Sequence, residues 1–225
     1  SPPSVVYATQ DGTITNHAFN GDKKVLVHSS TSRRLTKITA ITLTGDYIYC
    51  GVQIKTDDRA KATTMIWRYY RHRTNPTKCI FEANRQHNHH ENTISVLGVY
   101  NGKLYSGSSD YTIKVWNCST LCIISTLTGH TGKITCFARL GHLIFSGSTD
   151  KSIKSWDSRR NLLIQNIQMS SRVNCLKTFG NKLYGGGTNL LRVWEYSEES
   201  PQPRTGEANG SKASSANGTK KDKTS

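Results

Sequence analysis

The sequence predicts an all-β protein in which one small antiparallel sheet is repeated along the chain, and three observations lead to this prediction. First, Ser106–Trp116 (SGSSDYTIKVW) recurs forty residues later as Ser146–Trp156 (SGSTDKSIKSW). Second, in both copies a histidine stands sixteen residues before the first serine. Third, the surrounding segments are short, alternate polar with apolar residues and end in turn residues. A period of about 40 residues with this pattern is typical of sheets stacked around an axis.

These residues resemble the repeats of the WD-repeat β-propeller family. The matching segments are Thr128–His130 (TGH), Phe145–Asp150 (FSGSTD) and Ile153–Asp157 (IKSWD). In that family each repeat is one four-stranded blade, a Gly-His pair lies in the loop that leads into the blade, and Trp-Asp ends its third strand. The resemblance covers about residues 1 to 197. It implies a β-propeller of four-stranded antiparallel blades.

The resemblance also implies a structural role for four residues in each of two repeats. In the family, these residues form a hydrogen-bonded chain inside the blade, from Trp to Ser, from Ser to His and from His to Asp. An unpaired buried polar group costs about 1–3 kcal/mol, so such a chain would hold the turn and the loop in one geometry. The residues at these positions are His90, Ser106, Asp110 and Trp116 in one repeat and His130, Ser146, Asp150 and Trp156 in the next.

A catalytic triad is the alternative interpretation of His130, Ser146 and Asp150. The same set occurs twice, each time beside a tryptophan, and this repetition favours the structural role. No second motif supplies an oxyanion site. We therefore expect no enzymatic activity, and the sequence predicts neither a metal site nor a cofactor.

Strand patterns divide the chain into about five blades, at residues 1–30, 35–83, 93–127, 133–167 and 172–196. The first blade lacks its first strand. The fifth is expected to lack its outer strand, because the stretch after Ser197 contains Pro201 and Pro203 and is typical of a linker. Residues 198–225 are rich in Gly, Ser and Lys and are expected to be a disordered tail.

The uneven ends of this series predict an incomplete propeller. Propellers of this family close by lending an N-terminal strand to the last blade, since closure removes the exposed sheet edges. We therefore expect a chain that packs against its own missing upstream blades. A ring of about five blades that closes imperfectly on itself is the alternative.

Composition sets broad limits on the class of protein. The net charge is +15, from 30 Lys and Arg against 15 Asp and Glu. The six cysteines show no disulfide framework. Cys50, Cys136 and Cys175 lie in apolar strand contexts and are expected in the core, which fits a reducing compartment. No signal peptide or membrane-spanning pattern is visible. We expect an intracellular protein, cytoplasmic or nuclear, with no membrane partner.

Two basic segments are candidate binding surfaces. The insertion at residues 53–61 and the loop at residues 85–90 are expected on one face of the propeller, where they would suit an acidic partner, a phosphate group or nucleic acid. An ordinary solvated loop is the alternative. The candidate residues for a partner are Lys55, Arg59, Lys61, Arg85, His87 and His89.

The second basic segment, Trp67–Arg73 (WRYYRHR), is expected on the opposite face. Basic and aromatic residues interleave there, as they do on RNA-binding surfaces. A long third strand with its turn is the alternative. The candidate residues for nucleic acid are Arg68, Tyr70, Arg71, Arg73 and Lys78.

The resemblance favours a non-catalytic scaffold that holds proteins together in a complex. The repeats look like those of F-box/WD-repeat and zinc-finger/WD-repeat proteins, so substrate recognition within a ubiquitin ligase is one form of this hypothesis. RNA or other polyanion binding through the basic surface is an alternative. A third hypothesis is a regulatory module of an enzyme encoded upstream.

Overall fold

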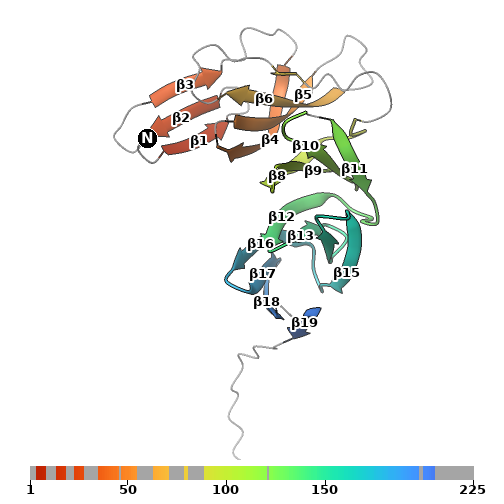
Figure 1. Ribbon diagram of the computed structural model, residues 1–225. Helices are drawn as coiled ribbons and strands as arrows, with labels where there is room; N and C mark the ends of the chain where they lie inside the picture. Colours follow the sequence, from red (N-terminus) through yellow and green to blue (C-terminus); the bar gives the residue numbers. More distant parts are fainter. Residues whose placement is uncertain are drawn as a thin grey trace, which may run out of the picture.

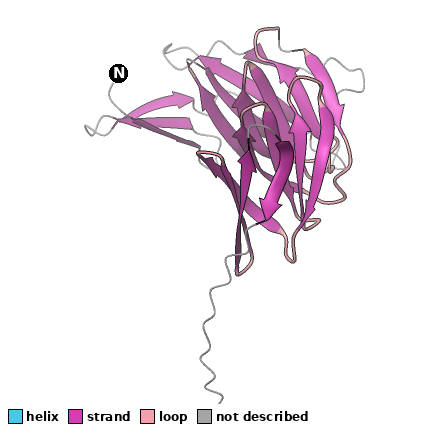
Figure 2. Ribbon diagram, turned by 60° about the horizontal axis from the view of Figure 1, so that its bottom comes forward, coloured by secondary structure: helices cyan, strands magenta, loops and turns pink. Residues whose placement is uncertain are grey.

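The computed structural model describes residues 4–8, 14–18, 23–27, 35–45, 47–54, 63–70, 79–80, 89–120, 122–197 and 200–205. Strands joined by turns make up this part of the chain, as Figure 2 shows. The predicted all-β fold class is confirmed. None of the described segments is a helix long and apolar enough to cross a bilayer.

The strands form five antiparallel sheets in which sequential strands are neighbours. The first sheet has three strands, β1 (Ser4–Ala8), β2 (Ile14–Ala18) and β3 (Lys23–Val27). The second consists of β4 (Leu35–Thr44), β5 (Tyr47–Ile54), β6 (Thr63–Tyr70) and β7 (Cys79–Ile80). The third consists of β8 (Ile94–Tyr100), β9 (Lys103–Ser108), β10 (Ile113–Asn117) and β11 (Ile123–Leu127).

The last two sheets repeat this order. The fourth consists of β12 (Ile134–Leu140), β13 (Leu143–Ser148), β14 (Ser152–Asp157) and β15 (Leu162–Gln168). The fifth consists of β16 (Val173–Phe179), β17 (Lys182–Gly187), β18 (Leu190–Ser197) and β19 (Ser200–Thr205).

The sheets follow one another along an arc, from the first sheet in red to the fifth in blue (Figure 1). The second to fifth sheets begin with an edge strand, and these edge strands, β4, β8, β12 and β16, pack against each other in sequence. Each sheet is therefore a blade whose first strand lies nearest a common axis. Within the described residues the arc is open, since no strand of the first sheet pairs with the fifth.

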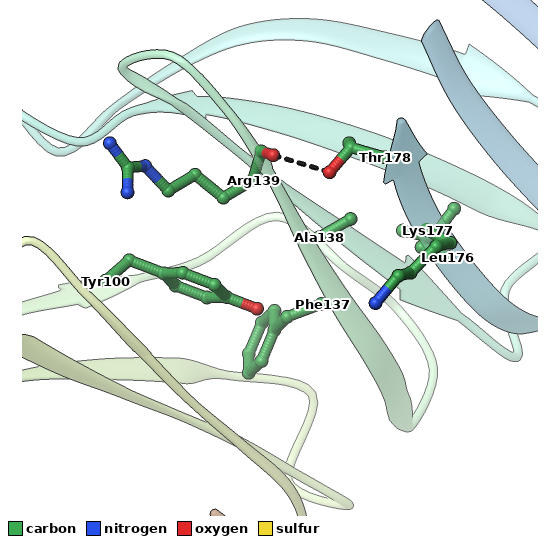
Figure 3. A pocket seen from close by; sticks show the side chains of 7 residues that line it. All are labelled: Tyr100, Phe137, Ala138, Arg139, Leu176, Lys177 and Thr178. Carbon is green, nitrogen blue, oxygen red and sulfur yellow. Dashed lines mark hydrogen bonds between the residues drawn. The ribbon is translucent and has the colours of Figure 1, made fainter. Parts of the chain in front are cut away.

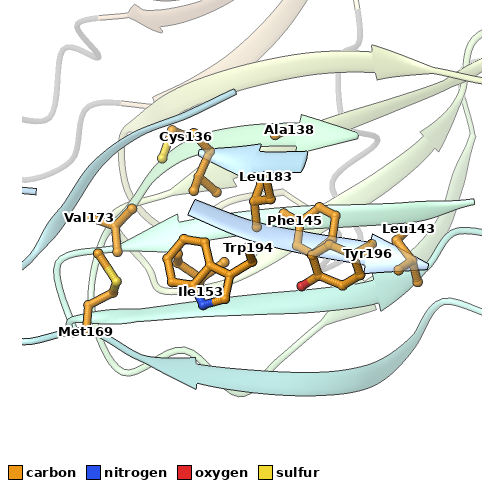
Figure 4. Packing of buried hydrophobic residues seen from close by; sticks show 11 residues of the cluster. Cys136, Ala138, Leu143, Phe145, Ile153, Met169, Val173, Leu183, Trp194 and Tyr196 are labelled. Carbon is orange, nitrogen blue, oxygen red and sulfur yellow. The ribbon is translucent and has the colours of Figure 1, made fainter. Parts of the chain in front are cut away.

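Buried apolar side chains fill the space between neighbouring sheets. Between the fourth and fifth sheets, Phe145 and Ile153 pack with Val173, Leu183 and Trp194, as Figure 4 shows. Corresponding clusters lie between the third and fourth sheets and between the second and third. The described core is thus a series of layers, one for each of these three pairs of neighbouring sheets.

A glycine at the same place in successive sheets allows this close approach. A Cβ atom on Gly107 would lie 2.6 Å from Cγ2 of Ile134, and one on Gly147 would lie 2.6 Å from Cγ1 of Val173. Ile134 and Val173 each begin the first strand of the next sheet. Any larger side chain at these glycines would therefore push neighbouring sheets apart.

The outer strand of the fifth sheet corrects the sequence prediction. The stretch after Ser197 was expected to be a linker, but residues 200–205 form β19, which pairs with β18 in the register Trp194↔Thr205 and Glu195↔Arg204. Pro201 and Pro203 are compatible with this strand because it lies at the edge of the sheet. On the outer side of an edge strand there is no neighbouring strand, so a proline, which lacks an N–H, loses no hydrogen bond there.

The fifth sheet also leaves one face uncovered. Ile153 in the fourth sheet is fully buried, whereas Leu191, at the equivalent position in the fifth, is 69% exposed. Cys175 was predicted to be a core residue and is exposed. Its equivalent, Cys136, is buried because the first strand of the fifth sheet covers it. Repeat position alone therefore does not decide burial, since burial also requires a next sheet.

We predict that Gly147→Ala destabilises the chain by about 1–3 kcal/mol, because the added methyl group overpacks the contact between the fourth and fifth sheets. Urea unfolding followed by tryptophan fluorescence measures this change. Gln168→Ala, on an exposed position of β15, is the matched control and is expected to stay within about 0.5 kcal/mol of the parent. Equal stability of the Gly147→Ala variant and the parent would contradict the close approach.

Candidate functional site

Four side chains of the fourth sheet form a continuous hydrogen-bonded chain. Trp156 donates its indole Nε1–H to Ser146 Oγ at 2.8 Å. Ser146 Oγ lies 2.8 Å from His130 Nε2, and His130 Nδ1 lies 2.6 Å from Asp150 Oδ2. This geometry is satisfied when the serine hydroxyl donates to Nε2 and the Nδ1–H of a neutral histidine donates to the carboxylate.

The third sheet contains the same chain. Trp116 Nε1–H donates to Ser106 Oγ at 2.9 Å, Ser106 Oγ lies 2.8 Å from His90 Nε2, and His90 Nδ1 lies 2.8 Å from Asp110 Oδ2. The two chains join the same elements in the two sheets: the third strand, the second strand, the loop that leads into the sheet and the turn after the second strand. We refer to each set of four residues as a tetrad.

The aspartate connects each tetrad to the backbone around it. Asp150 Oδ2 accepts the backbone N–H of Thr131 at 3.0 Å, and Oδ1 accepts the backbone N–H and the hydroxyl of Ser152 at 2.8 and 2.7 Å. Burial raises the pKa of Asp150, but the hydrogen bonds from Ser152 and His130 outweigh it and lower the pKa. Burial also lowers the pKa of His130, which favours the neutral imidazole.

The tetrads are closed to a substrate. Ser146 is 0% exposed, and its hydroxyl lies between Trp156 and His130. A serine nucleophile needs an open approach for the reacting carbonyl and donors for the oxyanion. The arrangement instead fixes a loop and a turn, because the four side chains of each tetrad are hydrogen-bonded to one another.

The fifth sheet replaces the tetrad with apolar packing. Met169 stands where the histidine is expected, and it is 3% exposed in the same cluster as Trp194 (Figure 4). Gly185 replaces the serine, and a Cβ atom there would lie 2.8 Å from the Trp194 ring. The ring therefore occupies the space that a serine side chain takes in the other two sheets.

The candidate partner-binding patch falls almost wholly outside the described residues. Lys55, Arg59, Lys61, Arg85 and His87 lie outside them. His89 is described and exposed, directly before the buried His90. The patch therefore remains a prediction.

Most of the candidate nucleic-acid residues also lie outside the described part of the chain, namely Arg71, Arg73 and Lys78, while Tyr70 ends β6. Arg68 is described. Its Nη1 donates to the carbonyl oxygen of Cys118 at 2.8 Å, and its guanidinium carbon lies 4.6 Å from the centroid of the Tyr47 ring. The hydrogen bond to Cys118 joins the second sheet to the third, and the contact with Tyr47 lies within the second sheet, so Arg68 has a structural role that the sequence pattern did not indicate.

A cavity of about 260 Å³ lies where three inner strands run side by side (Figure 3). Tyr100 of β8, residues 137–139 of β12 and residues 176–178 of β16 line it. The sequence pattern does not indicate this site, because its residues come from three repeats. One feature of the sequence could have indicated the cavity: Arg139 and Lys177 are cations within inner strands that are otherwise largely apolar.

We predict that Trp156→Ala lowers the free energy of unfolding by about 3–5 kcal/mol, because it removes a large buried ring and leaves Ser146 without its donor. Thermal unfolding followed by circular dichroism measures the loss. A control, Leu162→Ala, truncates a side chain that is 57% exposed and is expected to stay close to the parent. A melting temperature of Trp156→Ala within about 2 °C of the parent would rule out the structural role.

Comparison with known proteins agrees with this architecture. The family model described as "WD domain, G-beta repeat" matches residues 81–117 and 121–157. These ranges end at the tryptophan-containing strands of the third and fourth sheets. No curated protein matches the chain by sequence.

Solved structures resemble the chain in fold. The computationally designed Ika8 protein aligns with a TM-score of 0.67 and 23% identity over 87% of this chain and 56% of its own. The RRP9 WD40 repeats align with a TM-score of 0.62 and 19% identity over 91% of this chain and 57% of their own. The U3-55K structure aligns with a TM-score of 0.62 and 19% identity over 82% of this chain and 55% of its own.

At these identities the likeness concerns the fold alone, and the chain spans a little over half the length of these three structures. Two matched repeats, each with a tetrad in a four-stranded sheet, show that residues 81–117 and 121–157 are WD repeats, and the chain shares the propeller fold of these solved structures.

Proposed function

We propose that the chain is a non-catalytic protein-interaction scaffold that recognises a partner within a larger complex, such as a ubiquitin ligase. The observation that supports this most is the use of the polar residues in the two repeats. The hydrogen bonds of each tetrad fix the fold and leave its side chains unavailable for a reaction. This holds for His130, Ser146 and Asp150 and for their equivalents in the third sheet. The surface offered to a partner consists of loops, turns and strand edges on rigid sheets.

The free face of the fifth sheet supports a second part of this proposal, that further sheets of the same type cover it. Thr135 Oγ1 donates to the carbonyl oxygen of Val173 in the next sheet at 2.6 Å, and Ser95 Oγ makes the same contact with Ile134. Asn174 stands at the equivalent position in the fifth sheet and is exposed. A further sheet would give it an acceptor and would bury Leu191, as Ile153 is buried in the fourth.

Free thiols support an intracellular setting for this scaffold. Among the described cysteines, Cys50, Cys118, Cys122, Cys136 and Cys175 are all unpaired. A cytoplasmic or nuclear compartment keeps such thiols reduced.

Binding of RNA or another polyanion is the second candidate function, favoured by the net charge of +15. Binding of this kind would fall steeply with salt, because neutralised phosphates release counterions. Arg68 gives it little support, since its guanidinium already contacts Cys118 and Tyr47.

Affinity capture from cells separates the two functions. We expect the tagged chain to retain a protein complex of fixed stoichiometry in about 0.3 M salt and after nuclease treatment, a salt concentration at which phosphate contacts are strongly weakened. The Trp156→Ala variant is the control, since it damages the fold that presents the loops. Recovery of the parent chain alone would contradict the scaffold function. Loss of the complex on nuclease treatment would favour the polyanion.

A further inference from the structure

The cavity between the inner strands is built from specific contacts. Gly98 leaves space for Tyr100, since a Cβ atom at position 98 would lie 2.7 Å from Cε2 of that ring. The Tyr100 ring packs beside Tyr105, with 5.9 Å between centroids, and forms one wall. On the opposite side, Thr178 Oγ1 donates to the carbonyl oxygen of Arg139 at 2.7 Å and joins β16 to β12. Both walls are therefore fixed to the sheets.

Two positively charged side chains border this cavity, and neither has an acidic partner among the described residues. Arg139 and Lys177 are exposed, and neither forms an ion pair within the part of the chain that the structure describes. Arg139 donates its Nε–H to the carbonyl oxygen of Gly141 at 2.9 Å, which orients the guanidinium. Figure 3 shows the Tyr100 hydroxyl and the Lys177 ammonium pointing into the space in front of Phe137. The site is complementary to an anion.

The floor and the size of the cavity narrow the choice of anion. Phe137, Ala138 and Leu176 make the floor largely apolar, which suits an anion carried on aliphatic carbon. A volume of about 260 Å³ lies below the roughly 300–1,000 Å³ of small-molecule sites and suits one or two side chains. A nucleic-acid strand needs cations spread along its backbone, whereas the Arg139 guanidinium and the Lys177 ammonium stand at opposite ends of one cavity with an apolar floor (Figure 3).

We propose that this cavity binds a glutamate side chain, together with an apolar neighbour, on an acidic segment of a protein partner. The carboxylate accepts hydrogen bonds from the Tyr100 hydroxyl and the Lys177 ammonium, and a second carboxylate of the acidic segment reaches the Arg139 guanidinium at the other end of the cavity. The aliphatic part of the segment packs on Phe137 and Leu176. This assignment rests on the proposed scaffold function and names the chemistry of the partner.

Fluorescence anisotropy with a labelled peptide tests the assignment. The probe is fluorescein-labelled EELEEL, with QQLQQL as the uncharged counterpart. The cavity variant Arg139→Gln/Lys177→Gln removes two charges at the site. The control variant Arg160→Gln/Arg172→Gln removes two charges from exposed positions elsewhere on the same two sheets, so both variants carry the same net charge.

We expect the cavity variant to bind EELEEL about tenfold more weakly than the parent and the control variant to bind within about twofold, since a charged hydrogen bond contributes far more than a remote charge. The QQLQQL peptide should bind about tenfold more weakly to the parent. An equal loss of affinity for EELEEL in the two variants would show that binding comes from general charge attraction, and would contradict the proposed site. Absence of saturable binding up to about 1 mM would overturn it too, as would displacement of the peptide by poly(U) RNA at lower concentration.

Affinity capture with the cavity variant distinguishes this inference from the scaffold proposal. Loss of the captured complex with the cavity variant, and its retention with the control variant, supports the site. Capture of the same complex by the cavity variant would contradict the proposed glutamate site but not the proposed scaffold function. Recovery of the parent chain alone overturns the scaffold itself.

Discussion

The hydrogen-bonded chain from tryptophan to aspartate is the interaction on which the described structure most depends. In the fourth sheet it begins at the buried Trp156 and ends at Asp150, whose carboxylate accepts the backbone of the loop and of the turn. Polar groups in a sheet that is covered on both faces must be paired, since an unpaired one costs about 1–3 kcal/mol. The tetrad meets this requirement and at the same time fixes a surface loop to the core.

A second constraint is the close approach of the sheets. Gly107 and Gly147 bring each sheet against the first residue of the next, and apolar layers fill the remaining space. The proposed scaffold function draws on rigidity of this kind, because a partner would meet loops and strand ends that are already ordered. The cavity at Tyr100, Arg139 and Lys177 is a direct product of the stacking, since three successive inner strands supply its walls.

The repeat made much of the fold predictable. Spacing between His, Ser, Asp and Trp was enough to predict the third and fourth sheets, because those residues bond to one another within a single repeat. It was not enough to predict β19, since Pro201 and Pro203 suggest a linker unless the strand is known to lie at an edge. The burial of Cys175 was also mispredicted, because burial depends on a neighbouring sheet. The roles of Arg68, Arg139 and Lys177 depend on contacts between repeats. Such contacts cannot be recognised from the pattern within a single repeat.

The protonation of the tetrad is the most direct test of this account. Nitrogen-15 NMR of the histidine side chains reports the tautomer of His130, and proton exchange with solvent reports the protection of the Trp156 indole N–H. We expect a neutral His130 that carries its proton on Nδ1 near pH 7, and an indole proton that exchanges only when the sheet opens. A charged His130, an Nε2–H tautomer, or an indole proton that exchanges as fast as one in a free peptide would contradict it.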